Sequence, residues 1–227
     1  MIRVTENLRQ IRDLLAKAAV DAGREADCVK LLAVSKRQSH TRVIEAAAAG
    51  QRDFGENQVA EGVEKILSVA DDRLIWHFIG HLQTNKTRVV AEHFHWVHSI
   101  DRLKIAARLS KQRPDGLGDL NVCLQVNIDA EANKSGVPVD ELRDLAMQVA
   151  ELPRIRLRGL MCLPAIRHNF EDQREPFARL RRLADELAAD GIETDTLSMG
   201  MSADYRAAIF ENATIVRIGT AIFGARD

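Results

Sequence analysis

Apolar positions recur along this chain in two kinds of pattern, one with helical spacing and one of short continuous runs. The first pattern predicts an amphipathic helix at the amino-terminal end, with Thr5 as its N-cap and its last turn near Gly23. The apolar face of this helix is formed by Val4, Leu8, Ile11, Leu15 and Ala18. After it, short apolar runs and helical patterns alternate along the chain.

Eight of the apolar runs are typical of buried strands. They cover residues 30–35, 52–55, 75–80, 95–99, 121–127, 156–163, 194–198 and 214–218. The helical patterns between them cover residues 41–49, 59–69, 84–91, 101–112, 139–152, 171–189 and 203–210. Such alternation favours a parallel sheet with right-handed crossovers. Eight repeats predict that the sheet closes into an α/β fold, a (β/α)8 TIM barrel with an extra N-terminal helix, which forms a single domain over residues 1–227.

An open, doubly wound sheet is the alternative to the barrel. The dinucleotide-binding form of that fold has a G-x-G-x-x-G turn after its first strand, whereas this chain has Ser-Lys-Arg-Gln-Ser there. The length of 227 residues also suits a single barrel, which takes roughly 200 to 250 residues. Both observations favour the closed sheet.

The charge balance and the cysteines argue against several classes of protein. Lys and Arg total 32 against 33 for Asp and Glu, so the formal net charge of -1 offers no footprint for nucleic acid. The three cysteines are far apart and never form a C-x-x-C pair, which argues against a disulfide framework and a zinc site. The chain shows no signal-peptide h-region and no stretch that approaches a membrane span, so we expect a cytoplasmic protein with no membrane partner.

The histidines offer few candidates for a site. His93, His95 and His98 lie close together in sequence, but no clustered carboxylate or cysteine completes a set of metal ligands. We therefore expect no metal. His77 and His81 flank the end of the third predicted strand, where they are candidates for the mouth of a barrel site.

Lys36 stands at the end of the apolar run KLLAVSK, where the first strand would deliver its amine to the mouth of the barrel. Apolar neighbours disfavour the charged form of an amine, and the neutral form can attack an aldehyde to give a Schiff base. The alternative is a solvated strand terminus, which is what we expect of Lys30 at the other end of the run.

The last two predicted strands end in features that suit an anion. In TIM barrels, phosphate commonly binds the loops after strands seven and eight. Strand seven runs into Ser-Met-Gly-Met-Ser, ending at Ser202, and strand eight ends in Gly219 and Thr220. Glycines let backbone N–H groups approach an anion, and the two hydroxyl groups add donors. The alternative is that Ser202 is a helix N-cap and Gly219 a turn residue.

Arg217 is a charged residue inside the apolar eighth strand, on the same face as Ile215 and Gly219. A buried guanidinium stays protonated and needs acceptors. A buried carboxylate would satisfy it. If an aromatic cofactor is bound, Arg217 could instead donate to a ring nitrogen and keep that nitrogen unprotonated. A lysine for an aldehyde, a phosphate site and this arginine together describe a site for pyridoxal 5'-phosphate (PLP).

Several longer motifs carry a resemblance to a known family. They are AVSK (33–36), DFGEN (53–57), WHFIGHLQTNK (76–86), LSMGMSADY (197–205) and VRIGTAIFG (216–224). In these motifs the chain resembles the pyridoxal-phosphate homeostasis proteins (YggS/PROSC-like), which share a barrel with the alanine racemases. The resemblance covers nearly the whole chain and implies a role in intracellular PLP homeostasis and in amino-acid and keto-acid balance.

The resemblance also assigns roles to residues. It implies that Lys36 forms the Schiff base with PLP, that Asn57 lies near the phenolic oxygen and that Arg217 faces the pyridine nitrogen. Met199 would line the ring or the phosphate site, and the phosphate would be held by Ser202, Gly219 and Thr220. Asn57 alone could equally be the N-cap of the next helix. Lys134 belongs to a family-like loop, 127–136, where we expect a solvated lysine, with a visit to the site as the alternative.

Two other activities remain open at this point. A PLP-dependent amino-acid racemase of fold type III needs a second base, a tyrosine from an additional domain, whereas Tyr205 follows strand seven and no such domain is expected here. An unprotonated ring nitrogen also weakens PLP as an electron sink, so we expect no efficient catalysis. A class I aldolase-type barrel would use a Schiff-base lysine without a cofactor. The expected partners are PLP and PLP-dependent apoenzymes, and the chain is expected to be a monomer.

Overall fold

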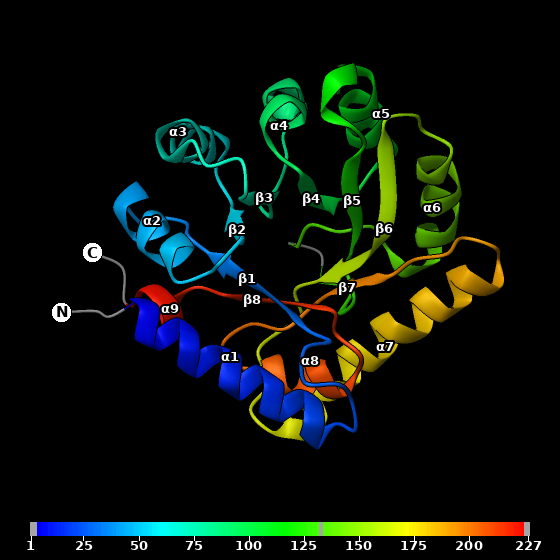
Figure 1. Ribbon diagram of the computed structural model, residues 1–227. Helices are drawn as coiled ribbons and strands as arrows, with labels where there is room; N and C mark the ends of the chain where they lie inside the picture. Colours follow the sequence, from blue (N-terminus) through cyan, green and yellow to red (C-terminus); the bar gives the residue numbers. More distant parts are fainter. Residues whose placement is uncertain (1–3, 132–133, 225–227) are drawn as a thin grey trace.

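The closed barrel predicted from the alternating pattern is confirmed. The structure is a computed structural model that describes residues 4–131 and 134–224. Eight parallel strands pair in the order β1-β2-β3-β4-β5-β6-β7-β8 and close by the pairing of β8 with β1. Helices surround this barrel on the outside (Figure 1). The carboxyl ends of all eight strands therefore meet at one mouth.

The elements follow the predicted order. The strands are β1 Lys30–Val34, β2 Asp53–Glu56, β3 Ile75–Phe78, β4 Trp96–Ile100, β5 Leu120–Val126, β6 Ile155–Cys162, β7 Thr196–Ser198 and β8 Ile215–Ile218. The α-helices are α1 Val4–Asp21, α2 His40–Ala48, α3 Val59–Val69, α4 Thr87–His93, α5 Leu103–Gln112, α6 Leu142–Ala150, α7 Phe170–Ala189, α8 Tyr205–Phe210 and α9 Thr220–Phe223. Three short 3₁₀ helices are η1 Thr84–Lys86, η2 Asp115–Leu117 and η3 Val139–Glu141.

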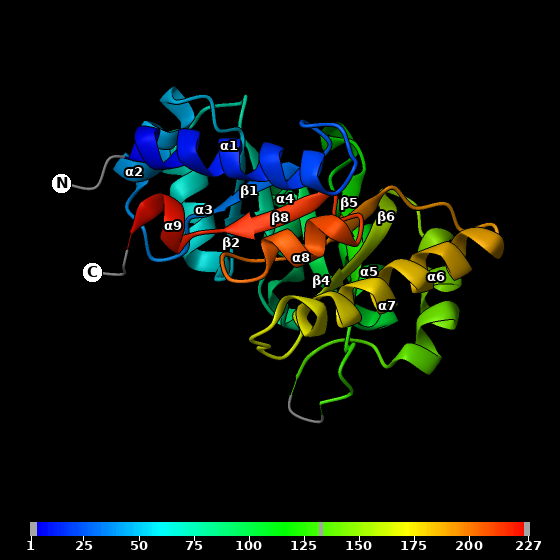
Figure 2. The ribbon, with the colours of Figure 1, turned by 90° about the horizontal axis from the view of Figure 1, so that it is seen from below.

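The amino-terminal helix packs on the outside of the barrel through its predicted apolar face. Val4, Leu8, Ile11, Leu15 and Ala18 are all buried, as the helical spacing predicts. The helix contacts α2, α8 and α9. Figure 2 shows it running beside α8 and α9, the last two helices of the chain. Asn7 also donates a hydrogen bond to the carbonyl of Ile222, 2.8 Å away. This helix therefore ties the amino-terminal end to the segment that follows β8.

The boundaries near the barrel mouth differ from the prediction in two places. Helix α8 begins at Tyr205, two residues later than the predicted helix, because Asp204 is its N-cap and also accepts a hydrogen bond from the Met201 N–H. The segment after β8, which the sequence pattern left as an irregular tail, begins with the short helix α9, whose N-cap is Gly219. Four residues are too few for a recognisable apolar period.

No helix within the two described ranges combines the length and apolar character that a membrane span requires.

Gly159 lies where β6 packs most tightly against β7. It pairs with Thr196, just after a register shift between β5 and β6. A Cβ atom on Gly159 would lie 1.8 Å from the Thr196 carbonyl oxygen. Only a shift of the backbone could remove this clash.

We expect Gly159→Ala to lower the free energy of unfolding by about 1–3 kcal/mol or more, the usual cost of overpacking. Urea unfolding followed by circular dichroism measures this change. Gly116→Ala is the matched control, because a Cβ there meets no atom within 4 Å. Equal unfolding curves for the two variants would contradict the described β6–β7 contact.

Candidate functional site

A cavity of about 680 Å³ opens at the carboxyl ends of the strands. This volume lies in the range of small-molecule sites, roughly 300–1,000 Å³. Its lining comes from the ends of β1, β2, β3, β5, β6, β7 and β8 and from the loops that follow them. Six of the seven site residues predicted from the sequence line it: Lys36, Asn57, Ser202, Arg217, Gly219 and Thr220.

Met199 is the exception and corrects the prediction. Its side chain is completely buried in the hydrophobic core, and Met199 is not among the residues that line the cavity. The Met199 N–H continues the pairing of β7 by donating to the Ile215 carbonyl. Met201, which is 38% exposed, lines the cavity instead. Of the two methionines in the Ser198–Ser202 segment, Met201 is therefore the one that faces the cavity.

Lys36 lies two residues beyond the last residue of β1, and its position is set by hydrogen bonds on both sides. On one side, Lys65 Nζ donates to the Ser35 carbonyl oxygen at 2.5 Å. On the other side, the Arg37 N–H donates to Glu61, and Arg37 has a left-handed backbone with φ 60°. Lys65 and Glu61 also bond to each other, at 2.7 Å. The backbone that carries Lys36 is therefore held at both of its neighbours.

A buried ion cluster stands behind this turn. Lys65 Nζ donates to Glu56 Oε1 at 2.8 Å, and the Ser35 hydroxyl donates to the same oxygen at 2.6 Å. Glu56 is completely buried and Lys65 is 5% exposed. Burial raises the pKa of Glu56, and the charge and hydrogen bond of Lys65 offset only part of that rise. Breaking such a cluster would leave a charge uncompensated in the interior.

Sequence reasoning missed Lys65, Glu56 and Glu61. The available signal was the spacing of Glu61 and Lys65, which are four residues apart on α3 and face each other across one helical turn. Such pairs are usually solvated. The contact of Lys65 with the end of β1 depends on how α3 packs against the barrel, which the local pattern does not contain.

Arg217 is buried at 4% exposure in β8, as expected, but its partners are not a carboxylate. Within the described residues, it donates to the Ser198 carbonyl at 2.5 Å, the Ser198 hydroxyl at 2.8 Å and the Cys162 carbonyl at 2.9 Å. Burial lowers the pKa of the guanidinium, and nearby negative groups offset part of that effect. A guanidinium has five N–H donors, so these contacts leave capacity for an acceptor in the cavity that Arg217 lines.

Asn57 reaches the cavity because the loops after β2 and β3 touch each other. A Cβ on Gly80 would lie 2.1 Å from the Asn57 carbonyl oxygen, so only glycine permits this approach. The N-cap of α3 is Gln58, which removes the capping alternative for Asn57. Asn57 is half-buried and lines the cavity.

The loops after β7 and β8 carry the predicted anion-binding groups, and the loop after β8 adjoins the end of β1. Gly219 lets the end of β8 pass close to β1, since a Cβ there would lie 2.8 Å from the Val34 carbonyl oxygen. Thr220 begins α9, and a first helical turn leaves backbone N–H groups available to other acceptors. Ser202 is exposed in the loop before Asp204, so it lines the cavity and does not cap α8.

Two further polar residues stand at the rim, and one predicted residue does not. His81 lines the cavity, and its Nδ1 lies 3.1 Å from the Ser135 hydroxyl. Lys134 also lines the cavity, and its amine lies 2.6 Å from Glu131. His77 is completely buried and is not among the lining residues, which corrects its placement at the mouth. No group of three or more His, Cys, Asp or Glu side chains within residues 4–131 and 134–224 is arranged to hold a metal ion.

Comparison with protein families gives a match over nearly the whole chain. The model of the alanine racemase N-terminal domain matches residues 3–227. The pyridoxal phosphate homeostasis protein of Pseudomonas aeruginosa is 55% identical over 227 residues, which cover 100% of this chain and 97% of that protein. The protein of the same name from Escherichia coli strain K12 is 52% identical over 232 residues and covers 99% of this chain and 97% of its own.

Solved structures show the same similarity. PipY of Synechococcus elongatus, in a structure with PLP bound, has a TM-score of 0.86 and 36% identity, covering 97% of this chain and all of that one. The alanine racemase of Corynebacterium glutamicum has a TM-score of 0.75 at 16% identity, covering 99% of this chain and 61% of the racemase. At that identity the racemase shows a shared barrel fold alone.

We expect Lys65→Met to lower the free energy of unfolding by about 3–5 kcal/mol, because the substitution leaves buried Glu56 without its cation. The double variant Lys65→Met/Glu56→Gln should recover part of this loss, since it also removes the uncompensated charge. Urea unfolding of both variants tests the cluster. Lys17→Met, on the exposed face of α1, is the surface control, with an expected change within about 0.5 kcal/mol. A loss no larger than that of the control would contradict the buried ion cluster of Lys65 and Glu56.

Proposed function

The chain belongs to the pyridoxal phosphate homeostasis proteins of the alanine racemase N-terminal-domain family, and we propose that it binds PLP in the cavity and acts in intracellular PLP homeostasis and in amino-acid and keto-acid balance. One observation carries the proposal. A single cavity gathers an amine, a buried guanidinium and two glycine- and hydroxyl-bearing loops, which suit the aldehyde, the ring nitrogen and the phosphate of PLP.

The types of residue that line the cavity fit the functional groups of PLP. Lys36 would hold the cofactor through its amine, and PLP would supply the aldehyde with which that amine can form a Schiff base. The two held neighbours of Lys36 fix the direction of its backbone, so the amine reaches the cavity from the β1 side. Asn57 offers an amide on the neighbouring loop, where we assign it to the phenolic oxygen.

The loops after β7 and β8 suit the phosphate. Ser202 and Thr220 contribute hydroxyl groups, and Gly219 allows backbone N–H groups to come close. Met201 takes the apolar lining role first predicted for Met199. Arg217 lies on β8, two residues before Gly219, and we propose that its remaining N–H donors bond the pyridine nitrogen.

Arg217 also argues for holding the cofactor over efficient catalysis. A guanidinium cannot give up its proton at neutral pH, so it acts on a ring nitrogen as a donor and leaves that nitrogen unprotonated. This weakens the electron-withdrawing power on which racemisation depends. Tyr205, the one tyrosine of the sequence, packs against the core at the start of α8 and is not among the cavity-lining residues. A fold type III racemase is therefore the second candidate.

The proposal extends to the partners of the protein. We propose that it acts in the cytoplasm as a monomer and hands PLP to PLP-dependent apoenzymes. The part of the cavity lined by His81, Ser135 and Lys134 is the side from which we propose that this exchange proceeds.

The absorption spectrum of the purified protein with PLP tests the site. We expect a visible band that borohydride reduction removes, and we expect the band to be absent from Lys36→Ala. Lys134→Ala is the matched control, because Lys134 also lines the cavity and should leave the band in place. A band that survives in Lys36→Ala would overturn the assignment. A protein that forms a Schiff base with an aldehyde substrate but takes up no PLP would support an aldolase-type barrel.

Exchange of the α-proton of amino acids separates the two PLP-based candidates. For the PLP-loaded protein in deuterium oxide, we expect exchange into alanine to stay near the rate of free PLP, because Arg217 leaves the ring nitrogen unprotonated. Proton NMR of the substrate measures it. Rapid exchange with equal formation of both enantiomers would establish the racemase in place of the homeostasis protein.

A further inference from the structure

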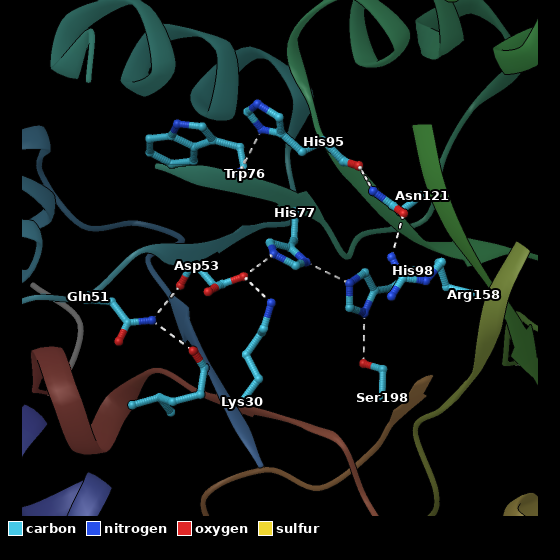
Figure 3. Close-up of polar contacts among 11 residues, drawn as sticks. Lys30, Gln51, Asp53, Trp76, His77, His95, His98, Asn121, Arg158 and Ser198 are labelled. Atoms are coloured by element: carbon cyan, nitrogen blue, oxygen red, sulfur yellow. Dashed lines mark hydrogen bonds and ion pairs between the residues drawn. The ribbon is translucent and has the colours of Figure 1, made fainter. Parts of the chain in front are cut away.

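The interior of the barrel contains a continuous chain of polar side chains that leads to Arg217. The other members of this chain have no role in the proposed function. Asp53 Oδ1 lies 3.0 Å from His77 Nε2, and His77 Nδ1 lies 2.9 Å from His98 Nε2. His98 Nδ1 lies 2.8 Å from the Ser198 hydroxyl, which accepts from Arg217 at 2.8 Å. Figure 3 shows the His77 ring between Asp53 and His98, with Ser198 beyond.

These contacts cross the barrel from end to end. Asp53 is the first residue of β2, at the amino ends of the strands, whereas Arg217 lines the cavity at the carboxyl ends. His77 and His98 lie in β3 and β4, and Ser198 lies in β7, so the contact between His98 and Ser198 spans the barrel between strands that do not pair. Both histidines are completely buried.

The chemistry of the two ends fixes the direction of every hydrogen bond between them. A carboxylate only accepts and a guanidinium only donates. His77 must therefore carry its proton on Nε2 towards Asp53, and its Nδ1 accepts from His98 Nε2–H. His98 Nδ1 then accepts the Ser198 O–H, which leaves the Ser198 oxygen to accept from Arg217. Every donor points away from the cation and towards the anion.

The charged surroundings agree with this arrangement. Burial raises the pKa of Asp53, but His77 and the Lys30 amine, 3.2 Å away, outweigh it and hold the pKa below its usual value. Burial lowers the pKa of His77 more than Asp53 raises it. Burial, together with the neighbouring His77 ring and the cations Arg217 and Lys30, holds the pKa of His98 well below its usual value. The two imidazoles are thus neutral between an anion and a cation.

Packing also fixes the orientation of the His77 ring. The His77 ring stacks on Trp96 with 5.3 Å between centroids and 13° between planes. Arg158 covers Trp96, with its guanidinium carbon 4.9 Å from the ring centroid. The fixed ring planes keep both nitrogens of His77 aligned with their partners.

We propose that Asp53, which also pairs with the Lys30 amine, sets the direction of the hydrogen bonds through His77, His98 and Ser198, and that this chain positions the Arg217 guanidinium for donation to a ring nitrogen. This role deepens the proposed function and rests on it. In this scheme the four residues are positioning residues, because only Arg217 touches the cofactor. A substitution at the closed end of the barrel then changes a hydrogen bond at its open end.

The histidine tautomers test the direction of the chain without any cofactor. In the full-length protein labelled with ¹⁵N-histidine, we expect His77 and His98 to be neutral and protonated on Nε2 at neutral pH. In Asp53→Asn the amide can donate to His77 Nε2, so both rings should shift towards the Nδ1–H tautomer. A wild-type His98 that is cationic or protonated on Nδ1 would overturn the proposal, whether or not the variant folds.

PLP binding tests the consequence at the cavity. We expect Asp53→Asn and Ser198→Ala each to weaken PLP binding about tenfold, the scale of one hydrogen bond to a charged group, and to shift the visible band. Asp71→Asn is the matched control: Asp71 also lies at the amino ends of the strands, in the loop before β3, but its carboxylate bonds to exposed Arg73, so affinity and band should match the wild type.

The outcomes separate the two proposals. If the wild type takes up no PLP, the proposed function fails, and the tautomers still decide whether the chain of hydrogen bonds has the stated direction. If the wild type binds PLP, and Asp53→Asn matches Asp71→Asn in affinity and band position, then the positioning role fails while the proposed function stands.

Discussion

The pairing of β1 with β8 is the contact on which the candidate site depends. It sets Leu32 beside Arg217 and Ala33 beside Ile218, although these residues are far apart in the sequence. The register brings the turn that carries Lys36 next to the loop that carries Gly219, and the absence of a Cβ on Gly219 allows the two strand ends to approach. Amine, guanidinium and anion-binding loop therefore converge only because the sheet is closed. An open sheet would place β1 and β8 apart from each other.

The barrel also departs from the common composition of its interior. TIM barrels usually fill this space with layers of branched apolar side chains. Here the interior includes a carboxylate, two imidazoles, a hydroxyl and a guanidinium, each with hydrogen-bond partners. A polar interior is tolerated only when its groups are satisfied, because each unpaired group would cost as much as several apolar contacts provide. The alignment of donors and acceptors across five strands meets this condition, and it links the closed end of the barrel with the cavity.

The sequence was informative wherever function depends on local pattern. The alternation of runs and helices predicts the barrel, and the position of Lys36, Ser202 and Thr220 at strand ends predicts their place in the cavity. It was uninformative where function depends on contacts between distant segments. His98 and Ser198 are 100 residues apart, and neither has a local signal that names the other. The role of Met199 came from the family resemblance, which names a motif with two methionines, and only the packing of this segment shows that Met199 is buried in the core while Met201 lines the cavity.

The buried ammonium of Lys65 has a consequence for chemical selectivity. Two lysine side chains stand near the end of β1, and an aldehyde does not discriminate between amines by itself. All three N–H donors of Lys65 are taken up by the Ser35 carbonyl and by two carboxylates, and its side chain is shut off from the cavity. An amine held in this way has no lone pair to offer an electrophile. The ion cluster therefore keeps Lys65 from competing for a carbonyl compound, and within the proposed function it leaves that reaction to Lys36.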